Sequence, residues 1–246
     1  MLKKAVKNFF GRFGYEIRNS NYKDIFTIRQ TMEEALSHIK DIGFYPELII
    51  DIGAADGTQP LQSIFNESEF FWVEPLSEFK PALESLKQQF KGDYLISAMG
   101  GEAGELEIKV HPDKVGSSIL EDISTSVSKE VRKIPVVTLR SIAEKRFQAH
   151  KKILLKIDVQ GFEPQVMEGA GDFLNRVDVI VLEVSLFRFY KDCPDLYDIV
   201  SFMKNKGFVV YDIVEGINRP LDFALAQKDL IFVKEHGFFR RSHNWS

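Results

Sequence analysis

A run of acidic and small residues closes the first apolar segment of the chain. Positions 48–52 read Leu-Ile-Ile-Asp-Ile and lead straight into Gly-Ala-Ala-Asp-Gly at 53–57. Small residues allow a ligand to approach the backbone closely, and glycine adopts positive φ angles at little cost. The pattern predicts a ligand-binding turn between a strand and a helix, made of residues Asp51, Gly53, Ala54, Ala55, Asp56 and Gly57.

The spacing of these small residues argues against a nicotinamide dinucleotide. The fingerprint of that cofactor needs glycines two and five residues after the first, and counting from Gly53 these positions hold Ala55 and Thr58. The carboxylates of Asp51 and Asp56 would repel a pyrophosphate, whereas a cofactor with a sulfonium and an ammonium group tolerates them. The turn favours S-adenosylmethionine. A turn that binds no ligand, with its acids solvated, is the alternative.

A second acid, Glu74, closes the next apolar segment, which reads Phe-Phe-Trp-Val-Glu-Pro at 70–75. It follows Asp51 by 23 residues, about the spacing at which an acid reaches the ribose hydroxyls of a bound nucleoside. We therefore expect Glu74 and Pro75 to line the cofactor site, which weakens the alternative without a ligand.

Two further acids close later apolar segments. Lys156 and Asp158 alternate along one strand and share a face, and Glu183 ends the following strand. We predict that Asp158 positions or deprotonates an acceptor hydroxyl, with Lys156 and Glu183 beside it. Two carboxylates at neighbouring strand ends could also hold a divalent cation, and Lys156 with Asp158 could be a purely structural ion pair.

Apolar segments alternate with helical patterns along most of the chain. Strands are expected at 48–52, 70–73, 94–97, 153–158, 177–184, 208–213 and 230–234, and helices at 31–42, 58–65, 77–90, 163–174 and 194–206. Between the third and fourth strands, 104–140 is expected to be an insertion of antiparallel strands, 105–110 and 132–138, around a serine-rich loop at 116–128. The fold class is α/β, a doubly wound and mostly parallel seven-stranded sheet.

The chain divides into a helical extension (1–45), one cofactor-binding domain (46–236) and a short tail (237–246). The first fifteen residues mix lysines with phenylalanines in an amphipathic pattern, so a weak contact with a membrane surface is an alternative to packing on the domain. The sequence contains no run of about 18 apolar residues, so no transmembrane segment is predicted. Thr31 and Glu34 have the spacing of a capping box at the start of a helix.

Four blocks of sequence resemble the FkbM family of S-adenosylmethionine-dependent methyltransferases, which have the class I, Rossmann-like fold. The narrowest match is Leu-Leu-Lys-Ile-Asp-Val-Gln-Gly-Phe-Glu at 154–163, followed by Met-Glu-Gly-Ala at 167–170. The other blocks are 51–57, Glu74-Pro75 with Leu83 behind it, and Gly116-Ser117-Ser118 with Val-Val-Thr-Leu at 136–139. The resemblance spans about residues 48 to 234.

The resemblance implies methyl transfer from S-adenosylmethionine, usually to a hydroxyl oxygen of a sugar, glycan or natural product. It places Asp51, Gly53 and Gly57 at the amino-acid end of the cofactor, Glu74 at its ribose, and Ser97 and Ala98 at its adenine. Ser117 and Ser118 are candidates for a loop over the acceptor. Glu163 either faces the acceptor or simply starts a helix, where an acid is favoured. Many relatives have asparagine in place of Ala55, and often glutamate in place of Gln160.

The amino-acid composition limits the kinds of molecule that we expect the protein to bind. With 36 acidic and 32 basic side chains the formal net charge is −4, so a general nucleic-acid binder is not expected and a neutral acceptor is. The single cysteine, Cys193, suits a cytoplasmic protein, and the five histidines have no zinc-binding spacing. A homo-oligomer is possible. The remaining alternatives for function are a scaffold or nucleoside binder of the same fold and a nicotinamide-dependent oxidoreductase.

The 21 phenylalanines are the unusual feature of the composition. Several belong to predicted strands and helices, and we expect those in the core. Two groups have no place in a methyltransferase core and are candidates for a lid, a dimer contact or an acceptor surface. They are Phe9, Phe10 and Phe13 near the start, and Phe238, Phe239 and Trp245 near the end.

Overall fold

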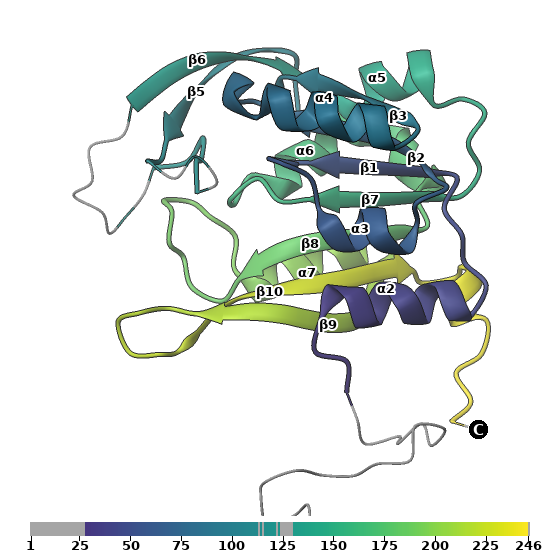
Figure 1. Ribbon diagram of the computed structural model, residues 1–246. Helices are drawn as coiled ribbons and strands as arrows, with labels where there is room; N and C mark the ends of the chain where they lie inside the picture. The colour runs from purple at the N-terminus through teal and green to yellow at the C-terminus, as the bar shows by residue number, and fades with distance from the viewer. Residues whose placement is uncertain (1–27, 113, 115, 122, 124–129, 246) are drawn as a thin grey trace, which may run out of the picture.

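The computed structural model describes residues 28–112, 114, 116–121, 123 and 130–245 (Figure 1). Within these residues seven strands form one sheet in the order β3-β2-β1-β7-β8-β10-β9. All neighbouring strands are parallel except β10, which runs antiparallel to both β8 and β9. The strands are β1 (Leu48–Ile52), β2 (Glu69–Glu74), β3 (Gly92–Ile96), β7 (Ile153–Ile157), β8 (Val179–Ser185), β9 (Phe208–Asn218) and β10 (Leu225–Lys234).

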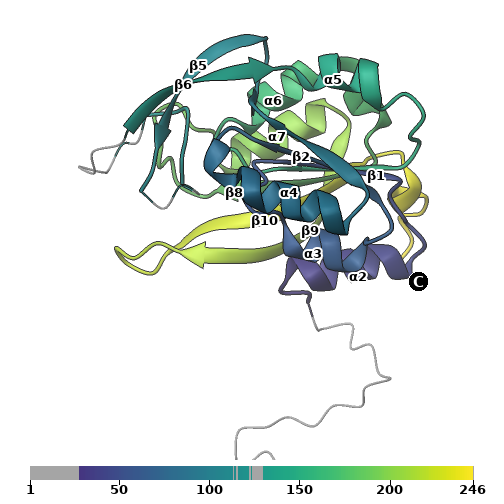
Figure 2. The same cartoon turned by 45° about the horizontal axis from the view of Figure 1, so that its top comes forward.

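The predicted doubly wound sheet is confirmed, with helices on both faces (Figure 2). Every residue of β1 and β7 is buried, as near-continuous apolar strands of a covered parallel sheet must be. Ile50 packs towards one face and Ile49 towards the other. The first face is covered by α5 (Leu139–Arg146), α6 (Glu163–Ala170) and α7 (Leu196–Asn205), and the second by α2 (Met32–Asp41), α3 (Gln59–Ile64) and α4 (Lys80–Gln89).

The helices of the structure differ in several places from those predicted from the sequence. The Thr31 capping box is present, and α2 buries Leu36 and Ile39 on the same sheet although it lies in the predicted extension. The predicted helices at 77–90 and 163–174 each include a 3-10 turn, η1 (Ser77–Phe79) and η2 (Gly171–Arg176). Helix α5 is missing from the prediction because its surface is polar and only Leu139 and Ala143 are buried.

The predicted insertion forms a second, smaller sheet. Strands β5 (Gly104–Val110) and β6 (Glu130–Val137) pair antiparallel, as expected, and β4 (Ala98–Met99) joins β6 to give the order β4-β6-β5. Ile108, Val110, Ile134 and Val136 form its small core against Leu76 and Ala98. Figure 1 places this sheet at the edge where the parallel strands end, which is where ligands of such sheets bind.

The aromatic residues near the C-terminus do not form the expected lid or free surface. The rings of Phe238 and Phe239 lie 6.3 and 5.1 Å from the ring of Phe44, and Phe239 also lies 5.3 Å from Tyr211. Both side chains are half-buried in η3 (Phe238–Arg240) and pack against the core under α2, away from the insertion, so they do not form a lid, and a dimer contact at these residues stays a prediction. Trp245 is exposed.

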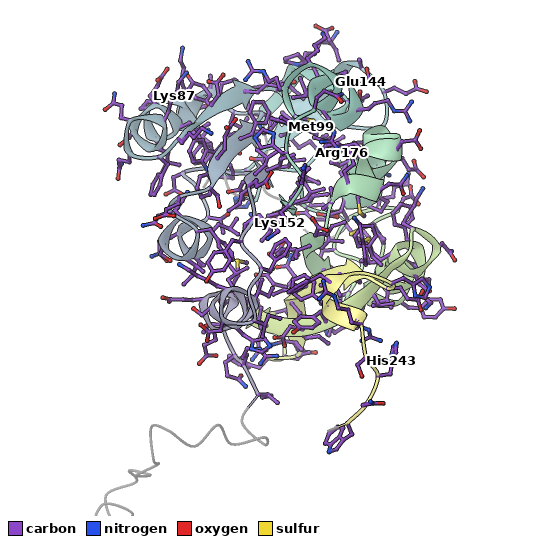
Figure 3. The ribbon with its side chains drawn as sticks, turned by 90° about the vertical axis from the view of Figure 1, so that its right-hand side faces the viewer. Lys87, Met99, Glu144, Lys152, Arg176 and His243 are labelled. Carbon is purple, nitrogen blue, oxygen red and sulfur yellow. The ribbon has the colours of Figure 1, made fainter. Side chains whose placement is uncertain are left out.

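The C-terminal tail leaves the molecule on the side away from the insertion. In Figure 3, Lys152, which lies just before β7, is near the centre of the view. His243 lies on the tail, which extends away from the folded domain. Phe9, Phe10, Phe13 and the amphipathic start lie outside the described residues. None of the helices in the described ranges is both long and apolar enough to cross a bilayer.

The small sheet offers a matched test of its core. We expect Ile134→Ala to lower the free energy of unfolding by about 2–4 kcal/mol, because it leaves a cavity among buried side chains. Val131→Ala on the same strand, where the side chain is exposed, should cost less than about 0.5 kcal/mol. Denaturant unfolding measures both, and equal costs would show that the insertion has no independent core.

Candidate active site

The acids that end the parallel strands come together at one edge of the sheet. Two of them, Glu74 and Asp158, line a cavity of about 640 Å³, open mouth included, which lies between the carboxyl ends of β1, β2 and β7 and the insertion. Of the residues predicted from sequence, Gly53, Ala55, Glu74, Pro75, Ser97, Ala98, Ser117 and Asp158 line it. The insertion contributes Ile108, Lys114 and Ile119, which sequence reasoning did not identify.

The turn after β1 runs tightly against the end of β7. Gly53 has φ +75°, and a Cβ placed on it would lie 1.8 Å from the backbone oxygen of Asp158. Gly57 has φ +98°, and a Cβ there would meet Nε2 of Gln62 at 2.4 Å. Ala55 between them also has a positive φ, +46°. Gly53 is therefore required by the close approach of two backbones, whereas at Gly57 the positive φ is the stronger reason, because the atoms nearby are the ends of side chains.

Glu74 is a buried carboxylate at the cavity wall. It is 5% exposed and accepts hydrogen bonds from the backbone N–H groups of Ala55, at 3.0 Å, and Leu76, at 2.9 Å. Burial raises its pKa to about 7, partly offset by these two donors. Such a carboxylate, backed by N–H groups on the protein side, suits the ribose hydroxyls of a nucleoside.

Lys156 lies between two carboxylates at the ends of β1 and β7. Its Nζ is 3.2 Å from Oδ2 of Asp158 and 3.6 Å from Oδ1 of Asp51. Burial acts to lower the pKa of Lys156, but these two charges outweigh it and the pKa is raised. The structural ion pair considered from sequence is thus present. Oδ1 of Asp51 is buried and accepts no hydrogen bond from the described residues, and the Lys156 ammonium at 3.6 Å is the positive charge beside it.

Asp158 and Glu183 are joined by the side chain of Gln160. Nε2 of Gln160 lies 2.9 Å from Oδ1 of Asp158 and 2.8 Å from Oε2 of Glu183, and Nε2 of Gln227 also donates to Oε2 of Glu183 at 2.8 Å. Burial, followed by the charges of Asp158 and Asp229, raises the pKa of Glu183 to about 8.

Sequence reasoning missed Gln227 and Asp229. Asp229 lies opposite Glu183 in the β8–β10 pairing, and burial raises its pKa to about 7. The polar run Gln-Lys-Asp at 227–229, directly before an apolar stretch, was the available signal.

Two predicted acceptor residues have partners inside the protein. The hydroxyl of Ser118, 1% exposed, donates to the backbone oxygen of Gln160 at 2.9 Å. Glu163 is 3% exposed, and its Oε1 accepts from the N–H groups of Val159 and Gly161, both at 3.1 Å. Both side chains hold the loop after β7, whereas Ser117 lines the cavity. The hydroxyl of Ser97 donates to the carbonyls of Ala98 and Pro135 and so ties the cavity wall to β6.

Among the described residues, no group of three His, Cys, Asp or Glu side chains is arranged to hold a metal ion. The divalent cation considered between Asp158 and Glu183 therefore stays a prediction. In the structure the amide of Gln160 lies between these two carboxylates.

The strand order, the antiparallel β10 and the acids after β1 and β2 define a class I, Rossmann-like methyltransferase that uses S-adenosylmethionine. Residues 51–210 match the methyltransferase FkbM domain, which is 160 of the 246 residues. The chain belongs to the FkbM methyltransferase family. This membership sets aside the oxidoreductase alternative. The cradle around Gly53 and the Glu74 carboxylate at the cavity wall fit the cofactor that the family uses.

Comparison with solved structures returns further methyltransferases. The chain is similar to an rRNA methylase from Streptococcus thermophilus, at 6% identity and TM-score 0.45, over 85% of this chain and 98% of that one. It is also similar to magnesium protoporphyrin IX methyltransferase from Synechocystis PCC 6803, at 12% identity and TM-score 0.43, over 94% and 96% of the chains. An S-adenosylmethionine-dependent methyltransferase from Clostridium acetobutylicum matches at 10% identity and TM-score 0.44, over 81% and 89%. No protein of curated function matches the sequence.

The close approach at Gly53 yields a matched pair of variants. Gly43 also has a positive φ, +95°, but a Cβ there meets nothing within 4 Å. We expect Gly43→Ala to cost about 1 kcal/mol of stability from backbone strain, and Gly53→Ala roughly 3 kcal/mol or more because its Cβ also overlaps a backbone oxygen. Thermal or denaturant unfolding measures both. Similar losses of stability in the two variants would mean that the Gly53 turn can move away from the loop after β7 at little cost.

Buried acids make stability depend on pH. Burial raises the pKa of Glu163 from 4.5 to about 7. The folded protein therefore holds this proton to higher pH than the unfolded chain does, and its stabilising contribution is full below pH 4.5 and lost as pH rises through about 7. We expect unfolding free energy to fall between about pH 5 and 8, and Glu163→Gln to reduce that fall by about 1.4 kcal/mol per unit of pKa displacement. Glu105→Gln, at an exposed position of β5, is the control, and an unchanged pH slope in Glu163→Gln would contradict the assignment.

Proposed function

We propose that the protein transfers a methyl group to a hydroxyl oxygen of a sugar, glycan or natural-product acceptor. The observation that carries this proposal is the carboxylate of Asp158 at the cavity wall, held by Lys156 on one side and Gln160 on the other. When bound, S-adenosylmethionine supplies a methyl group activated by its sulfonium. A hydroxyl, by contrast, needs a group that orients its oxygen and accepts its proton.

The surrounding charges suit this task. Lys156 lies between the carboxylates of Asp51 and Asp158 and offsets part of their negative charge, and an oxygen of Asp158 at the cavity wall can accept a hydrogen bond from the acceptor hydroxyl. Transfer of the proton to a carboxylate oxygen of Asp158 would accompany attack by the hydroxyl oxygen. Glu183 and Asp229 lie behind Asp158 and offer no positive charge to a polyanionic acceptor such as nucleic acid, so this side of the site suits a neutral hydroxyl.

The division of roles between two acids tests the proposal. Calorimetry should show binding of S-adenosylmethionine and S-adenosylhomocysteine but not of NADH. Glu74→Gln should weaken that binding about tenfold or more, because it removes a charged acceptor from the ribose. Asp158→Asn should leave the cofactor Kd within about threefold and lower turnover about 100-fold or more, because the proton acceptor is lost.

Turnover is followed with methyl-labelled cofactor and a panel of sugars, methyl glycosides and other hydroxylated compounds. Binding without transfer to any of them would favour the nucleoside-binding scaffold, and absence of heat with both adenosyl ligands would overturn cofactor binding. Equal loss of cofactor affinity in both variants would contradict the assigned roles.

A further inference from the structure

Gln160 occupies a position between two carboxylates that come from neighbouring strands. Asp158 follows β7 directly and Glu183 lies near the end of β8, and one nitrogen of the Gln160 amide is within hydrogen-bond distance of both. An amide NH₂ group has two N–H donors, so each carboxylate can receive one. Because the amide is neutral and does not titrate, these donors are present at any pH.

The Gln160 amide forms a bridge between Asp158 and Glu183. The charges around this bridge explain why its donor should be neutral. Asp158 and Glu183 repel one another, and Asp229 from β10 and Glu163 from α6 add to the negative potential at Glu183. Lys156 from β7 is the cation that acts on both Asp158 and Glu183, and it contacts Asp158 rather than Glu183, while Lys228 from β10 acts on Asp229. A carboxylate at position 160 would add another negative charge here, whereas the amide links the two acids without one.

The backbone of Gln160 is held in an unfavourable conformation that aims the side chain into this gap. Its φ is +55°, a region that residues other than glycine seldom adopt. The hydroxyl of Ser118 donates to its carbonyl oxygen, and Ser118 itself pairs with Lys109 of β5 through two backbone hydrogen bonds, at 2.9 and 3.3 Å. The insertion that covers the cavity therefore also holds the bridge.

We propose that Gln160 is a positioning residue, whose amide ties the Asp158 carboxylate to Glu183 and so sets its orientation towards the acceptor hydroxyl. This inference rests on the proposed function, in which Asp158 receives the hydroxyl proton. Gln160 acts through Asp158, and the bridge itself can be tested without an acceptor.

The test compares two glutamines that differ in what they contact. Gln160 donates to both Asp158 and Glu183, whereas Gln227 donates to Glu183 alone. Carboxyl ¹³C NMR titrations of the full-length chain, assigned with Asp158→Asn and Glu183→Gln, report the two midpoints. Gln160→Leu should raise both by about one pH unit, because a donor to each ionised form is lost, and Gln227→Leu should raise that of Glu183 only.

Unchanged midpoints in Gln160→Leu, or a shift of Glu183 alone, would overturn the bridge. Where Gln160→Leu fails to fold, Gln160→Asn keeps the amide but is one methylene too short to span both acids, and the same outcomes apply to it.

The functional part is read from methyl-label transfer. Gln160→Leu should lower kcat about tenfold or more while the Kd for S-adenosylmethionine stays within about twofold, since the residues assigned to the cofactor are untouched. An unchanged kcat with shifted midpoints would overturn the positioning role. If the wild-type protein transfers no label, the proposed function fails, and the titrations still decide whether the bridge exists.

Discussion

The rest of the site depends on one buried ammonium group. Lys156 is almost fully buried at the end of β7, and a charge in that position is tolerated only with partners of opposite sign. It has two, Asp51 at the end of β1 and Asp158 just after β7. The pairing joins the two central strands at the edge where the cavity lies, and removing Lys156 would leave the buried carboxylate of Asp51 without a compensating charge.

Around this ion pair the loops are held by backbone contacts that leave little freedom. The Gly53 turn lies against the Asp158 carbonyl, Glu163 holds the loop after β7 through two N–H groups, and Ser118 joins that loop to the insertion. Raised pKa values of Glu74, Glu163 and Glu183 follow from the same close packing, because buried carboxyls favour their neutral forms. Clusters of this kind concentrate at functional sites.

Two departures from the FkbM pattern occur where the backbone is strained. Ala55 and Gln160 both have positive φ angles, +46° and +55°. Asparagine enters this region more readily than alanine does, which gives a physical reason for the asparagine that the family resemblance implies at position 55. At position 160 the amide found here makes hydrogen bonds to two acids that a glutamate side chain could not donate to when ionised. At position 160 the site thus differs in charge from the pattern that the resemblance implies.

Local patterns in the sequence determined most of the framework. Apolar runs located the strands, the spacing of Thr31 and Glu34 located a helix start, and the position of acids after apolar runs brought Asp51, Glu74 and Asp158 to one edge, because parallel strands end together. Only the tertiary structure decided the contacts made across long separations. The antiparallel register of β10 places Asp229 opposite Glu183, the folding of the tail packs Phe238 and Phe239 against Phe44, and the insertion places the hydroxyl of Ser118 on the carbonyl oxygen of Gln160. Register and packing between distant segments depend on how whole elements fit together, which no short stretch of sequence encodes.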